Sequence, residues 1–97
     1  MTKQKKAEAM TNLYVGNLSK DTTERQLKSV FGTFGMVERV TIVLDRETGA
    51  SQGFAFVEMA NSFEARSARK ILNGSLVNGH PMQISEARAL AVVIGKT

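Results

Sequence analysis

The segment from Gln52 to Met59, which reads Gln-Gly-Phe-Ala-Phe-Val-Glu-Met, restricts the fold more than any other part of the chain. In a strand, successive side chains point to opposite faces. One face of this segment is then small and apolar, as a core face should be: Gly53, Ala55, Val57 and Met59. Phe54 and Phe56 fall on the other face, between Gln52 and Glu58. Aromatic rings on an open sheet face mark a binding surface, and flat rings suit flat ligands such as nucleobases.

The composition excludes several classes of protein. The 97 residues suffice for one compact domain, and the absence of cysteine excludes disulfides, thiolate zinc sites and cysteine nucleophiles. There is no apolar run near the roughly 18 residues of a membrane span and no signal-peptide core, so we expect a cytoplasmic protein that binds no membrane. The formal net charge of +4 fits a polyanionic partner, and equally an ordinary surface with a lysine-rich tail.

The first part of the chain predicts a tail, a strand and a helix. Residues 1–11 are expected to be a flexible basic tail, and residues 12–18 a strand with Tyr14 on the face opposite Leu13. Thr23 and Gln26 then fit a capping box. Apolar residues follow at helical spacing: Leu27, Val30, Phe31 and Phe34. The Gly32 to Gly35 stretch also matches the GxxG loop of KH domains, which we reject because Phe34 continues the apolar stripe.

The second part predicts a hairpin, another helix and a last strand. Residues 37–44 are rich in β-branched side chains and should pair with the Gln52–Met59 strand. Asn61 is the expected cap of the second helix. The apolar side of this helix is expected to consist of Ala65, Ala68, Ile71 and Leu72. Asn78-Gly79 marks a two-residue hairpin turn, and residues 82–87 read as the final strand.

The order strand, helix, strand, strand, helix, strand is that of the split β-α-β unit, whose crossovers are right-handed. We therefore predict an α+β, ferredoxin-like fold: a four-stranded antiparallel sheet with two helices on one face and Tyr14, Phe54 and Phe56 on the other. The domain should span residues 12–88, followed by an apolar extension over residues 89–97. This extension could pack on the domain, across the open sheet or against a second copy. A monomer is expected, with dimerisation through the extension as the alternative.

Two segments resemble the RNP motifs of the RNA recognition motif (RRM) family. Leu13 to Leu18 is similar to the six-residue motif, and Gln52 to Met59 to the eight-residue one. The resemblance covers residues 12–88 and extends to the short, single-domain RRM proteins of bacteria. It implies that bases stack on Tyr14 and Phe56 and that Phe54 packs against sugars. Gln52 replaces the lysine or arginine of the family motif, which removes a phosphate partner.

The resemblance implies a single-stranded RNA-binding protein of low to moderate sequence specificity. Single-stranded DNA stays an alternative ligand, because stacking does not depend on the sugar. The expected RNA-binding residues are Tyr14, Phe54, Phe56, Asn12, Gln52, Arg39, Lys20, Arg46, Gln83, Ser85 and Arg88.

Other functions find less support in the sequence. No cofactor or metal is expected, and the carboxylates lack the paired spacing of an acid–base site. The single histidine, His80, falls in a predicted turn, so we do not expect an enzyme. The alternative is an RRM-fold protein-interaction module that uses the apolar C-terminus or the basic side of the second helix, formed by Arg66, Arg69 and Lys70.

Overall fold

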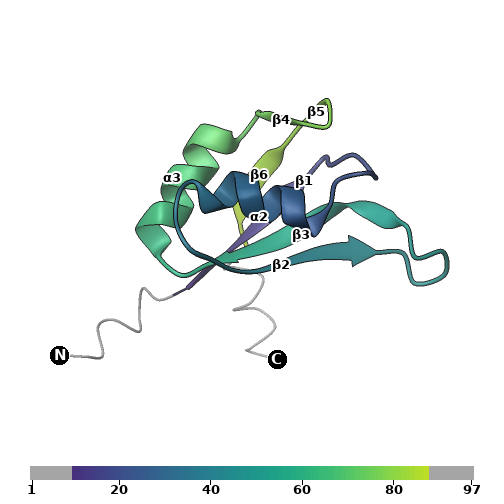
Figure 1. Ribbon diagram of the computed structural model, residues 1–97, viewed down its shortest axis with the longest axis horizontal. Coiled ribbons are helices and arrows are strands. Elements are labelled where there is room, and N and C mark those ends of the chain that lie inside the picture. Colours follow the sequence, from purple (N-terminus) through teal and green to yellow (C-terminus); the bar gives the residue numbers. More distant parts are fainter. Residues whose placement is uncertain (1–9, 88–97) are drawn as a thin grey trace.

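The computed structural model describes residues 10–87, and its elements follow the predicted order (Figure 1). Strand β1 spans Thr11–Gly16, helix α2 Glu24–Gly32, strand β2 Val37–Leu44, strand β3 Ser51–Met59 and helix α3 Ser62–Leu72. Two short strands, β4 (Leu76–Val77) and β5 (His80–Pro81), precede the last strand, β6 (Gln83–Glu86). Most of the predicted basic tail, the candidate Arg88 and the apolar C-terminal extension lie outside the described residues.

The main sheet has four antiparallel strands in the order β2-β3-β1-β6, with β1 and β3 at its centre. Tyr14 is in register with Phe56, and Leu13 with Val57. Paired residues of neighbouring strands point to the same face, so the apolar pair and the aromatic pair lie on opposite faces. The prediction of an α+β, ferredoxin-like fold is confirmed.

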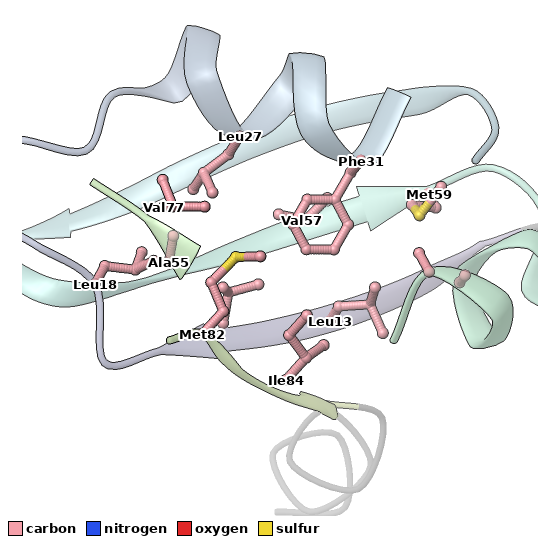
Figure 2. Packing of buried hydrophobic residues seen from close by; sticks show 13 residues of the cluster. Leu13, Leu18, Leu27, Phe31, Ala55, Val57, Met59, Val77, Met82 and Ile84 are labelled. Carbon is pink, nitrogen blue, oxygen red and sulfur yellow. The ribbon is translucent and has the colours of Figure 1, made fainter. Parts of the chain in front are cut away.

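Both helices lie on one side of the sheet and enclose the core with it (Figure 1). Figure 2 shows Phe31 reaching from α2 toward Val57 of β3 and Leu13 of β1, and all three side chains are fully buried. Burying a side chain of this size contributes about 1.5–3 kcal/mol. This packing determines which face of the sheet the helices cover, and therefore which face they leave to the rings.

Side-chain caps define where the helices begin. The Thr23 hydroxyl accepts a hydrogen bond from the Gln26 backbone N–H (3.1 Å), and Gln26 Oε1 accepts one from the Thr23 N–H (3.0 Å). The predicted capping box is confirmed. Asn61 Oδ1 caps α3 by accepting from the backbone of Phe63 and Glu64. Neither helix in the described part of the chain is long and apolar enough to cross a membrane.

The predicted hairpin turn at Asn78-Gly79 is also confirmed. Val77 is in register with His80, and the two residues between them have φ angles of 54° and 83°. Positive φ at both central residues is the geometry of a two-residue turn of type I′. The Asn78 side chain then donates to the hydroxyl of Thr22 (3.2 Å), which ties the hairpin to the segment before α2.

Three details of the sequence prediction are wrong. Ile71 was expected on the core side of α3 but is 62% exposed. At about 100° per residue it lies about 120° from Ala65, outside the stripe that Ala65 and Ala68 bury. The first strand ends at Gly16, two residues early, because Asn17 adopts a left-handed φ of 58°. The last strand is shorter at both ends than residues 82–87.

Candidate nucleic-acid interface

Three aromatic rings meet on the sheet face opposite the helices. The Tyr14 ring centroid is 5.7 Å from that of Phe54 and 6.0 Å from that of Phe56, and the two phenylalanine centroids are 6.4 Å apart. All three side chains are partly exposed. Rings at these separations contact one another and still offer surface to a ligand. The fold thus brings together the three aromatic residues that the sequence places on the open face.

The planes of the rings are not parallel. Tyr14 and Phe56 are inclined by 63°, and Phe54 and Phe56 by 87°. A base that stacks on a ring lies parallel to it, so bases on Tyr14 and Phe56 cannot remain stacked on each other. The surface therefore fits the splayed bases of an unpaired strand better than the stacked bases of a duplex.

Gly16 gives the Tyr14 ring its place on the sheet. A Cβ atom on Gly16 would lie 2.6 Å from the Tyr14 hydroxyl oxygen and 2.9 Å from ring atom Cε2, which is too close for van der Waals contact. Residues two apart in a strand share a face, so the ring lies along β1 over the glycine. The sequence prediction missed this role, although the spacing of Tyr14 and Gly16 would have indicated it.

The strand register arranges the other residues of this face in rows across the sheet. The row through the rings contains Ser85 of β6, Tyr14 of β1, Phe56 of β3 and Thr41 of β2. The next row contains Asn12 of β1, Glu58 of β3 and Arg39 of β2. The predicted residues Asn12, Arg39 and Ser85 therefore flank the rings. Thr41 and Glu58 complete the two rows and were not among the expected binding residues.

Gln52 lies at an irregular point of β3. The β2–β3 register shifts between Ile42 and Leu44, and Gly53 has a φ angle of 90°. Strict alternation of faces therefore stops at Gly53, and the reasoning that placed Gln52 on the ring face does not hold there. The Gln52 side chain is exposed, but its face is no longer fixed by its spacing from Phe54.

The remaining candidates lie at the edges of the ring face or outside the described residues. Gln83 of β6 is exposed and pairs with Gly16. Lys20 is exposed in the loop between β1 and α2, and Arg46 in the loop between β2 and β3, so neither lies on the sheet face itself. Arg88 falls beyond residue 87. Within residues 10–87, no group of three His, Cys, Asp or Glu side chains could hold a metal ion.

Comparisons with known proteins identify the family to which the sequence and the fold belong. The model of the RNA recognition motif family matches residues 13–83. A Nostoc sp. protein named "Putative RNA-binding protein RbpB" is 43% identical over 77 residues, which are 79% of this chain and 75% of that protein. The crystal structure of RNA Binding Protein PG1 has a TM-score of 0.77 at 38% identity and covers 79% of this chain and 93% of its own. The Sxl-lethal protein/RNA complex has a TM-score of 0.73 at 36% identity, over 77% of this chain and 45% of that one. By sequence motif and by fold, this chain belongs to the RNA recognition motif family.

Proposed function

We propose that this chain binds single-stranded RNA on the face of the sheet that carries Tyr14, Phe54 and Phe56. The observation that carries the proposal is the ring cluster, with centroids 5.7–6.4 Å apart on the face opposite the core. Bases stack on Tyr14 and Phe56, and Phe54 packs against sugars. Membership of the family, the RNA-binding names of similar proteins and the similarity to a chain in an RNA complex support this function.

Stacking supplies most of the affinity in this proposal. Each stacked base contributes about 1–3 kcal/mol, so two bases give about 2–6 kcal/mol before the cost of ordering the strand. Contacts between phosphates and loop cations such as Lys20 and Arg46 add a term that weakens as salt is raised. Stacking tolerates any base, which gives a low to moderate sequence specificity. Single-stranded DNA offers the same bases and is the natural comparison ligand.

The stacking role is tested by removing one ring from each side of the molecule. Phe56→Ala should weaken binding of a random single-stranded RNA by about 1–3 kcal/mol, measured by fluorescence anisotropy. Phe63→Ala is the matched control, because Phe63 is 69% exposed on α3, on the helix layer. The control should bind as the wild type does. Equal affinities of the Phe56→Ala variant and the wild type would contradict stacking.

A second measurement locates the interface without a mutation. Amide shifts followed during an RNA titration should concentrate on β1 and β3, around Tyr14 and Phe56. A duplex of the same sequence should cause weaker shifts, because its bases are not free to stack on the rings. Shifts confined to α3, near Arg66 and Lys70, would place the RNA on the helix layer and overturn the proposal.

A further inference from the structure

A carboxylate lies on the face proposed to bind RNA. Glu58 follows Phe56 by two residues on β3 and shares its face, and its side chain is partly buried. An acidic group repels phosphate, so its position next to a stacking ring works against affinity for the backbone. This position calls for a role other than phosphate binding.

Glu58 has no polar partner among residues 10–87. Arg39 is its register neighbour on β2, yet the ion pair that the structure shows joins other residues, Arg66 and Glu86, at 3.6 Å. On the other side of Glu58 lies Asn12 of β1, whose Oδ1 is buried without a hydrogen-bond partner. An unmatched buried acceptor destabilises the free protein, and a ligand donor that reaches it recovers the missing hydrogen bond.

The three side chains form an ordered row of hydrogen-bonding groups. From β2 to β1 the row offers the donor Arg39, the acceptor Glu58 and the acceptor oxygen of Asn12. Neighbouring strands are about 4.8 Å apart, so the long side chains of Arg39 and Glu58 can converge on one base above the sheet. Asn12 as a residue is only partly buried, so Oδ1 would have to turn outward by a change of side-chain rotamer to meet a ligand.

We propose that this row reads guanine, with Glu58 as the residue that determines base specificity. The Watson–Crick edge of guanine carries, in order, the acceptor O6 and the donors N1–H and N2–H2. This order complements the donor, acceptor and acceptor of the row. Glu58 accepts from N1–H and N2–H2, Arg39 donates to O6, and Asn12 accepts the second hydrogen of the amino group.

The other bases match the row less well. Adenine offers one donor beside the acceptor N1, cytosine offers one donor beside two acceptors, and uracil offers one donor between two acceptors. A carboxylate can pair in a bidentate manner only with two adjacent donors, and guanine alone has them on this edge. The inference rests on the proposed function, because the guanine is held in place by stacking on the neighbouring Phe56 ring.

The test compares short uridine-rich RNA oligonucleotides with a single guanosine, adenosine, cytidine or inosine at the central position, and an all-uridine control. The wild type should bind the guanosine oligonucleotide about 5- to 150-fold more tightly than the adenosine, cytidine or uridine ones, the range for a good bidentate contact. Inosine lacks the N2 amino group and should give an intermediate affinity.

Glu58→Gln distinguishes base reading from a change of net charge. This variant should bring the ratio of the affinities for the guanosine oligonucleotide and the other oligonucleotides close to one. It should also raise the affinity for the all-uridine strand, because the carboxylate no longer repels phosphate. Glu24 is exposed at the start of α2, in the helix layer. Glu24→Gln changes the net charge equally and should leave the guanosine preference unchanged. Asn12→Ala should narrow the difference between guanosine and inosine without abolishing it, because Glu58 still accepts one hydrogen of the N2 amino group.

The outcomes separate this inference from the proposed function. Equal affinity of the wild type for all central bases, a preference for another base, or a guanosine preference that survives Glu58→Gln would each overturn guanine reading while leaving RNA binding in place. Failure of every oligonucleotide to bind would overturn the proposed function and this inference together.

Discussion

At the scale of single residues, the proposed interface relies on a small residue to place one of its rings. The Tyr14 ring occupies the space that a side chain at Gly16 would fill, since a Cβ there would come within 2.6 Å of the hydroxyl. The glycine thus leaves the space in which the Tyr14 ring lies. Its contribution is steric, and it can be measured separately from the ring's own contribution to stacking.

Gly16→Ala should displace the Tyr14 ring from its place along β1. RNA binding should then weaken by at most the free energy of stacking one base, about 1–3 kcal/mol. The displaced group is the free end of a side chain on an open face, so we expect only a small fall in melting temperature. Anisotropy titrations give the affinity, and the Tyr14 ring resonances report its movement.

A double-mutant cycle shows whether Gly16 acts through Tyr14. If it does, Gly16→Ala combined with Tyr14→Ala should bind as weakly as Tyr14→Ala alone. Losses of binding free energy that simply add would show that Gly16 acts independently of the ring, and the positioning role would be wrong.

At the scale of elements, the start of β3 departs from regular strand geometry. The Gly53 N–H donates to Ser51 Oγ (3.0 Å), and its carbonyl accepts from the Leu18 N–H (2.8 Å). The loop that leaves β1 is thereby held against β3, directly before Phe54. Gly53 has a φ angle of 90°, where residues with a Cβ are disfavoured.

Gly53→Ala should therefore lower the free energy of unfolding by about 1–3 kcal/mol, measured by urea denaturation. Gly32→Ala is the matched control, because Gly32 lies in α2 and an added Cβ would meet no atom within 4 Å. Alanine is the better helix former, so this control should be neutral or stabilising by up to about 1 kcal/mol. Equal effects of the two substitutions would show that the backbone at Gly53 is not constrained.

The elements also show which features can be predicted from sequence. Thr23 with Gln26, the alternation from Phe54 to Met59, and Asn78-Gly79 are local signals, and the fold uses each of them in the predicted way. They fix the type and order of the elements, from which the split β-α-β arrangement with right-handed crossovers follows. The three rings could be assigned to one face because side chains alternate regularly between the two sheet faces in the parts of β1 and β3 that carry the rings.

What could not be predicted depends on contacts between distant segments. Ile71 is apolar but exposed, because the side of α3 that packs against the sheet is the one that carries Ala65 and Ala68. The irregularity at Gly53 depends on its bonds to Ser51 and Leu18, which no periodicity reveals. The row of Asn12, Glu58 and Arg39 follows from the register of three strands, which the sequence pattern alone does not specify.

At the scale of the whole molecule, the two layers differ in the role expected of their cations. The chain has a formal net charge of +4, so a polyanion is attracted to it as a whole. Lys20 lies in the loop after β1 and Arg46 in the loop between β2 and β3. Lys70, in contrast, is exposed on α3, in the layer that covers the opposite face. Only cations within reach of the bound strand should release counterions on binding.

The salt dependence of RNA binding measures these contacts directly. If Lys20 and Arg46 each meet one phosphate, the logarithm of the affinity should fall with the logarithm of the salt concentration. The slope should be about −1.4, since each contact contributes about −0.7 on a single strand. Lys20→Gln and Arg46→Gln should each make the slope shallower by about 0.7 without altering the preference among bases. Lys70→Gln, with the same change in charge, should leave the slope unchanged. A slope that responds to Lys70→Gln and not to the loop variants would mean that the phosphates run along the helix layer, because the contribution of a cation requires proximity to the strand.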